Sequence, residues 1–147
     1  MNNNHIKDLE EVFHSFKKFN IDKISCLFIA NDLGKIGLYP GKTKKDLLDK
    51  IYSSLIKINN NLTIVVPTAN LNLINSDKVF DLKNTPSFKM GAFSEYIRKI
   101  EGSKRSNHPF WSLTAKGPLA KKIVNKVSDH GYDENSAFGN LFKIKDS

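Results

Sequence analysis

The segment Leu62-Thr63-Ile64-Val65-Val66-Pro67-Thr68 is a short apolar run that ends at a proline. A continuous run of this length, rich in β-branched residues, is typical of a strand that is buried on both faces. Pro67 ends the expected strand after Val66, because proline has no N–H to donate to a neighbouring strand. The kind of sheet that this strand enters depends on what precedes it along the chain.

A second apolar run, residues 24–30, lies upstream and also predicts a strand that is buried on both faces. Between the two runs, Thr43 and Asp46 have the spacing of a capping box and predict the start of a helix. The apolar side of that helix contains Leu47, Leu48, Ile51, Leu55 and Ile58. Two strands joined by a helix predict a right-handed βαβ unit.

Apolar residues three or four apart predict three further helices, over residues 5–19, 90–100 and 118–127. Residues 70–87 are polar and irregular, and a loop of this length in a compact domain is usually functional, so we expect a lid on the substrate side. The chain has no repeat, composition break or linker. We therefore expect residues 1–147 to form one α/β domain.

Composition indicates an ordinary globular protein, with 39% hydrophobic and 26% charged residues among 147. No apolar run approaches the roughly 20 residues that span a bilayer, and the N-terminus does not have the pattern of a signal peptide. Cys26 is the single cysteine, which is consistent with a reducing compartment. We expect a cytoplasmic protein without a membrane contact.

The formal net charge of +8 suggests a polyanionic partner, either a nucleic acid or the phosphates of a nucleotide cofactor. Only Arg98 and Arg105 are arginines, however, and lysine lacks the rigid fork that suits bidentate contacts with phosphates or bases. The lysines are also scattered, and the aromatic residues have core spacings. We therefore do not favour a nucleic-acid-binding module.

Four segments carry a family pattern in the same order along the chain. The last is Arg105-Ser106-Asn107-His108-Pro109-Phe110-Trp111-Ser112, in which Pro109 holds His108 extended in a loop. The first three are Ala30-Asn31-Asp32-Leu33-Gly34; Val65-Val66-Pro67-Thr68; and the set Phe80-Asp81, Thr85-Pro86-Ser87, Met90-Gly91-Ala92, Glu95 and Arg98. In these segments the chain resembles the aminoglycoside N-acetyltransferase family, over what corresponds to its N-terminal half.

This resemblance implies a fold and an activity. The fold is a mixed sheet with flanking helices and a βαβ core, a three-layer sandwich that is incomplete relative to the family. The implied activity is acetyl transfer from acetyl-CoA to an amino group of an aminoglycoside or an amino sugar. A typical member is nearly twice as long, and its C-terminal catalytic half is absent here. The alternative is therefore a truncated, inactive or partner-dependent half-domain, completed by a second chain or by self-association.

The resemblance also implies that the bend after the first strand and the His-Pro loop bind the CoA thioester. The implied cofactor-binding residues are Asn31, Asp32, Leu33, Gly34, Arg105, Ser106, His108 and Ser112. A carboxylate at Asp32 would repel a phosphate, so either its side chain points away or cofactor binding is weakened. We assign no catalytic residue, because the chain has no counterpart of the segment that carries the family's catalytic centre.

Each remaining candidate has a simpler interpretation. His108 could hydrogen-bond a neighbouring loop, and Trp111 could pack instead of stacking on a substrate. Cys26 in a buried strand is expected to be a structural thiol. His130, with Asp129 and Asp133, could hold a metal, but such a cluster in a polar loop often occurs by chance, so we predict no metal site. The loop 128–140 is either a surface for a cationic substrate or a solvated turn.

Overall fold

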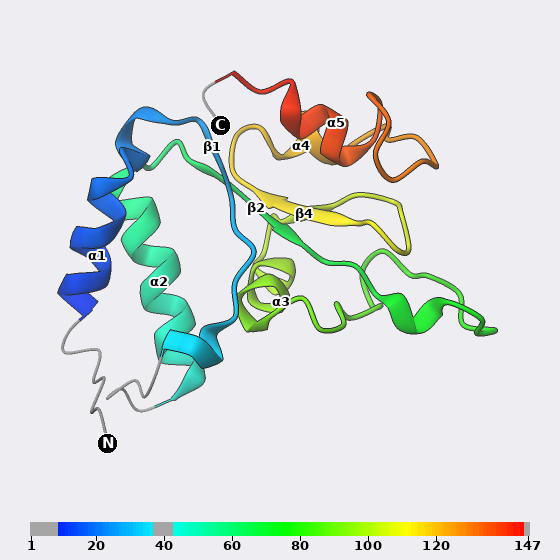
Figure 1. The fold of residues 1–147 in the computed structure, drawn as a ribbon, viewed down its shortest axis with the longest axis horizontal. Helices are drawn as coiled ribbons and strands as arrows, with labels where there is room; N and C mark the ends of the chain where they lie inside the picture. The colour runs from blue at the N-terminus through cyan, green and yellow to red at the C-terminus, as the bar shows by residue number, and fades with distance from the viewer. Residues whose placement is uncertain (1–8, 37–42, 146–147) are drawn as a thin grey trace.

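The computed structural model describes residues 9–36 and 43–145, in which a central sheet is built on the expected βαβ unit (Figure 1). Strand β1 (Cys26–Phe28) pairs in parallel with β2 (Thr63–Pro67), and helix α2 (Lys44–Ile58) connects them. Thr43 caps this helix, because its side-chain oxygen accepts a hydrogen bond from the Asp46 N–H at 3.1 Å. The helix therefore begins at Thr43, as the spacing predicted.

The end of α2 is tied to the segment that leads into β1. The side-chain amide of Asn59 donates to the carbonyl oxygens of Ile21 and Ile24, at 3.0 and 2.8 Å. Ile21 begins the short 3-10 helix η1 (Ile21–Lys23), and its side chain is buried under α2. These bonds fix where β1 begins relative to the helix.

Two antiparallel strands complete the sheet. Strand β4 (Leu113–Lys116) pairs with β2, and β3 (Lys104–Arg105) pairs with β4, which gives the order β1-β2-β4-β3 among the described residues. The sheet is therefore mixed, as expected. The sequence analysis did not predict β3 or β4, but the turn between them contains His108, which lies in a loop as predicted.

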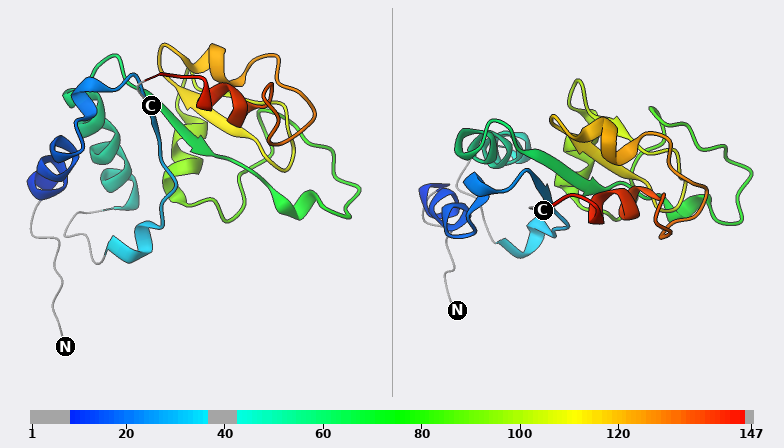
Figure 2. Two further views of the ribbon diagram at one scale, coloured as in Figure 1. Left: turned by 45° about the horizontal axis from the view of Figure 1, so that its top comes forward. Right: turned by 90° about the horizontal axis from the view of Figure 1, so that it is seen from above.

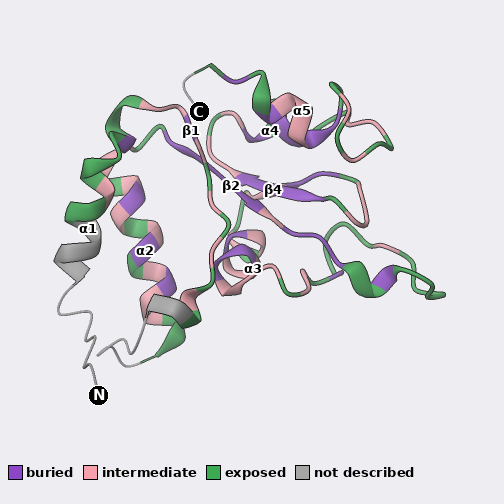
Figure 3. Cartoon of the chain, viewed as in Figure 1, coloured by how far each residue is buried: buried purple, intermediate pink, exposed green. Residues whose placement is uncertain are grey.

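Helices cover both faces of the sheet and produce the expected three layers. Helix α3 (Ala92–Lys99) lies on one face, and α4 (Ala120–Val124) and α5 (Ala137–Phe142) lie on the other, as Figure 1 shows. Side chains of β2 alternate between the layers: Ile64 and Val66 pack with α2 and α3, and Val65 packs with α4 and α5. Strands β2 and β4 are buried almost throughout (Figure 3).

The first helix, α1 (Leu9–Lys18), lies against α2 at one end of the molecule (Figure 2). The sequence predicted a helix over residues 5–19, of which residues 5–8 lie outside the described part. The other two predicted helices are shorter than expected. Gly91, with φ of 92°, precedes α3, and Lys126, with φ of 52°, follows α4, so these residues leave the helical conformation at the helix ends.

The expectation that the first strand is buried on both faces is wrong. Cys26 is fully buried, but the Phe28 side chain remains 40% exposed. The physical reason is that β1 is an edge strand, with β2 on one side only, so neighbouring elements cover it less completely than they cover β2. Sequence length and apolar content did not distinguish this edge strand from the central β2.

The segment between β2 and α3 is a long loop, as predicted, and it extends beyond the end of the sheet in Figure 1. It includes the short 3-10 helix η3 (Leu71–Leu73), and Val79 in it is 88% exposed. Within the described part of the chain, none of the helices is long and apolar enough to cross a membrane.

Candidate functional site

The two segments predicted to bind the cofactor lie at the same edge of the sheet. Residues 31–34 follow the carboxyl end of β1, and residues 106–112 form the turn that leads into β4 beside the carboxyl end of β2. The Asn70 N–H donates to the Pro109 carbonyl at 3.3 Å, which attaches this turn to the segment after β2. Ligands of open α/β sheets bind outside the carboxyl ends of the strands, so this edge is the candidate site.

The bend after β1 presents a short polar turn. The carboxylate of Asp32 accepts a hydrogen bond from the Gly34 N–H at 3.0 Å, and both residues are exposed. Leu33 packs against the core cluster to which α2 and α3 contribute, and it begins the 3-10 helix η2 (Leu33–Ile36). The Asp32 carboxylate is thus occupied within its own turn.

Asn31 joins this bend to the start of α3. A Cβ atom on Gly91 would lie only 2.5 Å from the Asn31 carbonyl oxygen, so glycine permits the close approach of the two backbones. The side-chain oxygen of Asn31 is buried and has no hydrogen-bond partner among the described residues. A buried acceptor without a donor is costly, so this oxygen is an exception to the general pairing of buried polar atoms.

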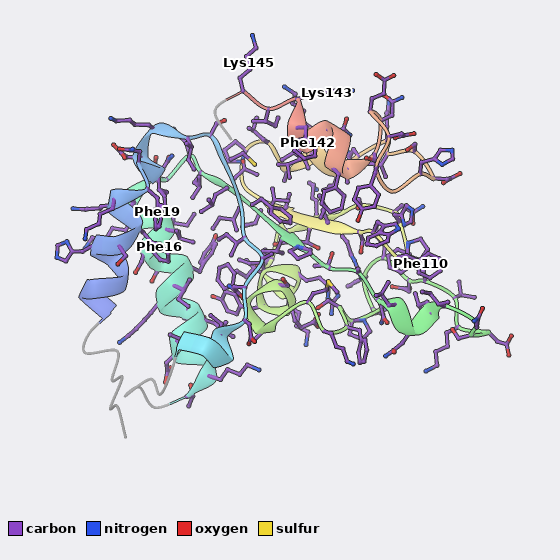
Figure 4. All side chains as sticks on the ribbon, viewed as in Figure 1. Phe16, Phe19, Phe110, Phe142, Lys143 and Lys145 are labelled. Atoms are coloured by element: carbon purple, nitrogen blue, oxygen red, sulfur yellow. The ribbon has the colours of Figure 1, made fainter. Side chains whose placement is uncertain are left out.

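The turn before β4 is held by its own side chains. Ser106 Oγ accepts from the Leu113 N–H at 2.9 Å, and the Ser106 N–H donates to the Leu113 carbonyl at 2.9 Å. His108 Nδ1 accepts from the N–H groups of Phe110 and Trp111, at 3.2 and 3.1 Å. The contacts of His108 are therefore those of a loop link, and a contact with a cofactor stays a prediction. Figure 4 labels Phe110 at this turn.

Ser112 and Arg105 belong to a buried polar network on the α3 face. Ser112 Oγ donates to the Thr68 carbonyl at 2.9 Å and accepts from Arg105 Nε at 3.2 Å. The Thr68 and Thr114 hydroxyls are 3.0 Å apart. Thr68 and Thr114 were not predicted as site residues, although Thr68 directly follows the proline that ends β2.

The guanidinium of Arg105 is directed at the loop between β2 and α3. It donates to the carbonyl oxygens of Thr68, Leu82 and Thr85. Burial, and then the charge of Arg98, lower the pKa of Arg105 to about 10. Arg105 therefore remains charged at neutral pH and anchors the loop; contact with a cofactor phosphate stays a prediction.

Glu95 and Arg98 provide a second anchor for the same loop. The Glu95 carboxylate accepts from the Ser87 N–H at 3.0 Å and pairs with Arg98 at 2.7 Å. Arg98 also donates to the Lys83 carbonyl at 2.6 Å. Burial raises the pKa of Glu95, but hydrogen bonds from Arg98 and Ser87 outweigh it and hold the pKa at about 2.

Four aromatic rings form a continuous aromatic row on the α5 face of this edge. The ring centroids are 6.1 Å apart for Phe28 and Phe138, 5.2 Å for Phe138 and Tyr132, and 5.0 Å for Tyr132 and Trp111. Tyr132 is 64% exposed and Trp111 39% exposed. The aromatic row thus runs from β1, beside the bend, to the turn that contains His108. Sequence analysis missed it because α5 was not predicted.

The structure therefore brings Arg105 and Ser112 into contact, bonds Ser106 to Leu113 beside them, and places residues 31–34 at the same end of the sheet. No hydrogen bond between residues 31–34 and that turn occurs in the described part of the chain. Cys26 lies buried, which raises the pKa of its thiol to about 11. The described residues contain no group of three or more possible metal ligands, and the Asp133 carboxylate accepts from Ser128 Oγ at 2.7 Å.

Comparison with known proteins gives a family and a fold. A family model described as aminoglycoside 3-N-acetyltransferase matches residues 49–146. Among solved structures, the YokD protein from Bacillus subtilis is 23% identical with a TM-score of 0.77, and the match covers 91% of this chain and 60% of that one. No curated protein matches the chain.

Two further solved structures were determined with ligands. AAC-VIa with bound sisomicin is 19% identical with a TM-score of 0.74, and AAC-IIIb with CoASH is 16% identical with a TM-score of 0.73. Each match covers 90% of this chain and 54% of the other. The chain thus spans little more than half the length of these solved proteins, and the likeness shows that it shares their fold over that part.

Proposed function

The chain belongs to the aminoglycoside 3-N-acetyltransferase family, and on this premise we propose that it binds acetyl-CoA for transfer of the acetyl group to an amine. The proposed acceptor is an amino group of an aminoglycoside or an amino sugar. The binding of CoASH by AAC-IIIb and of sisomicin by AAC-VIa supports these two ligand classes.

One observation carries the proposal: the bend at residues 31–34 and the turn at residues 106–112 lie at one edge, and the aromatic row connects them. Aromatic faces bind planar rings by stacking, which suits the adenine of a nucleotide. These features fit an extended, nucleotide-bearing cosubstrate.

Acetyl transfer requires a deprotonated amine, a polarised thioester carbonyl and a geometry that brings the two together. Of these three requirements, we assign the geometry to this chain, because the end of its sheet would hold the cosubstrate in a fixed orientation. His108 Nδ1 already accepts two backbone hydrogen bonds, which places the proton of a neutral ring on Nε2. We assign no catalytic base among these residues.

The test is a calorimetric titration with acetyl-CoA of the wild type and two single variants. Tyr132→Ala removes a ring from the aromatic row, and Phe142→Ala removes an exposed ring of α5 that lies outside the row. We expect about tenfold weaker binding for Tyr132→Ala and unchanged binding for Phe142→Ala. Absence of acetyl-CoA binding by the wild type would refute the proposal.

Transfer itself is measured as release of the CoA thiol from acetyl-CoA with sisomicin as the acceptor. Thiol release that depends on the acceptor would support acetyl transfer by this chain. Binding of acetyl-CoA without such release would limit the function of the chain to cosubstrate binding.

A second candidate is a half-domain that acts only with a further polypeptide. The observation in its favour is the exposed end of α5, where Phe142 is 84% exposed beside Lys143 (Figure 4). An interface with a further polypeptide would cover this ring. Light scattering coupled to gel filtration tests this candidate: self-association that Phe142→Ala abolishes would favour it, and a stable monomer would count against it.

A further inference from the structure

A cavity of about 340 Å³ lies beside strand β3 and is lined from the loop before α3, from α3 and β4, and from the C-cap of α4. This volume is within the range of small-ligand sites. None of the described residues that line it is acidic, and four of them are cationic: Lys83, Arg98, Lys104 and Arg105. Leu82, Ser103, Thr114 and Asn125 complete its lining. None of the rings of the aromatic row lines this cavity.

The two arginines are fixed in place. Arg98 is held by Glu95 and by the Lys83 carbonyl, and its side chain is only 8% exposed. Arg105 is bonded to carbonyl oxygens of the loop and to Ser112 Oγ. Their positive charges are therefore preorganised at the wall of the cavity, with little conformational entropy left to lose when a ligand binds.

The two lysines supply the donors that can move. Lys83 is exposed and Lys104 is half-buried, and no hydrogen bond or ion pair of either ammonium group occurs in the described part of the chain. Each ammonium group carries three N–H donors and no acceptor. Both can turn toward an anion in the cavity without breaking an existing bond.

The charge in the cavity is only partly compensated. Glu95 neutralises Arg98, but the acceptors of Arg105 are neutral oxygens. The charge of Arg98 also contributes, after burial, to the lowered pKa of Arg105, while Glu95 and Asp81 oppose it. Two cations that repel one another across a partly buried space are stabilised by an anion between them.

We propose that this cavity binds the phosphate group of a small phosphorylated ligand, at a site separate from the acetyl-CoA edge. Several cations around one small volume suit the multiple charges and oxygens of a phosphate. The inference rests on the cavity alone and does not require the chain to be an acetyltransferase.

The experiment is a calorimetric titration of the full chain with inorganic phosphate at low ionic strength. We compare the wild type with Lys83→Gln, Lys104→Gln and the control Lys121→Gln, which changes an exposed lysine of α4 outside the cavity. We expect each cavity variant to weaken phosphate binding by roughly tenfold and the control to leave it unchanged. Equal effects of all three variants, or no phosphate binding by the wild type, would overturn the proposal.

A repeat of the titration with saturating acetyl-CoA identifies the source of the phosphate. Unchanged phosphate affinity supports a separate phosphorylated ligand. Competition that is lost in Lys104→Gln would instead assign the cavity to a phosphate of the cosubstrate, and so would overturn the separate site. If the two sites are separate, Lys83→Gln should leave acetyl-CoA binding unchanged. The phosphate site and the proposed acetyl-CoA site can therefore be refuted independently of one another.

Discussion

The guanidinium of Arg105 lies over the ring of Phe80, 4.7 Å from the ring centroid. Arg105 belongs to β3, and Phe80 belongs to the long loop between β2 and α3. The same guanidinium donates to the Thr85 carbonyl in that loop. One buried side chain thus combines a cation–π contact with hydrogen bonds to fix the loop against the sheet.

Replacement of Arg105 by lysine is expected to release this loop. Lysine keeps the charge but cannot donate in a planar fork to several carbonyl oxygens, which would lose their donors. We expect a loss of about 3 kcal/mol in the free energy of unfolding, measured by urea denaturation, and faster proteolysis within residues 70–87. Lys104→Gln, at the neighbouring position, is the control. Unchanged proteolysis of Arg105→Lys would show that other contacts hold the loop.

The lowered pKa of Glu95 predicts how the free energy of unfolding depends on pH. Its pKa falls from the ordinary 4.5 to about 2 in the folded protein, so the unfolded chain binds its proton first as the pH decreases. The stabilisation is fully present above pH 4.5 and is lost between about pH 4.5 and 2. Its upper bound is about 3 kcal/mol, reduced by solvent because the side chain is 25% exposed.

The measurement is the free energy of unfolding of wild type and Glu95→Gln from pH 7 to pH 2. Glutamine keeps an acceptor for Ser87 but loses the ion pair with Arg98. We expect the wild type to be more stable at pH 7 and the difference to disappear near pH 2. Glu101→Gln, an exposed position, serves as the control. A difference that stays constant with pH would exclude this role of the carboxylate.

Cys26 should be unreactive in the folded protein. Burial raises the pKa of its thiol from 9.0 to about 11, so the thiolate fraction at pH 8 falls about a hundredfold. We expect slow reaction with a chromogenic disulfide reagent in the native state and rapid reaction in denaturant at the same pH. Equal rates would mean that β1 opens readily. Because Cys26 is unreactive, the protein's own thiol does not contribute to the signal in the assay of CoA thiol release.

The βαβ unit could be predicted because its signals are local. Thr43 begins α2 through a hydrogen bond within its own turn, and the apolar run of residues 62–66 marks β2. The predicted end after Val66 was one residue early, because Pro67 still pairs with Leu113 of the antiparallel strand β4. The short strands β3 and β4 could not be predicted in this way. Lys104 and Arg105 have no strand pattern, and Arg105 is buried because Thr68 and Thr85, distant in sequence, supply carbonyl oxygens.

The candidate site was also predictable only where its signals are local. The sequence placed Asn31 and His108 in two loops, but it did not show how the two loops lie relative to one another. The aromatic row depends on the position of α5, which sets Phe138 against Phe28. Such pairs form through tertiary packing between separate elements, so no local spacing indicates them.

Gly131 is expected to control the position of Trp111. A Cβ atom at this position would lie 2.5 Å from Trp111 Cδ1, so Gly131→Ala forces the indole to shift and disturbs its packing with Tyr132. Trp111 is the single tryptophan of the chain, and its fluorescence therefore reports on the aromatic row. We expect a red-shifted emission and stronger quenching by acrylamide. Tyr132→Phe, which keeps the ring, should leave the emission unchanged, and an unchanged spectrum of Gly131→Ala would contradict this packing.

Asp32 offers a test of where the phosphates of acetyl-CoA approach. Its carboxylate accepts from the Gly34 N–H, and asparagine can accept the same hydrogen bond without the charge. If a phosphate lies beside the bend, Asp32→Asn removes a repulsion of about 1 kcal/mol and tightens acetyl-CoA binding about fivefold at low salt. The gain should shrink as salt is added, because added ions screen exposed charges.

Asp22→Asn is the matched control for this charge change, because Asp22 is also exposed but lies in η1, before the opposite end of β1. Equal tightening by both variants would indicate a general effect of net charge instead of a local phosphate. Unchanged affinity of Asp32→Asn would place the phosphates away from residues 31–34. A gain confined to Asp32→Asn would mean that the bend after β1 meets the charged end of the cosubstrate, and that its native carboxylate weakens the binding.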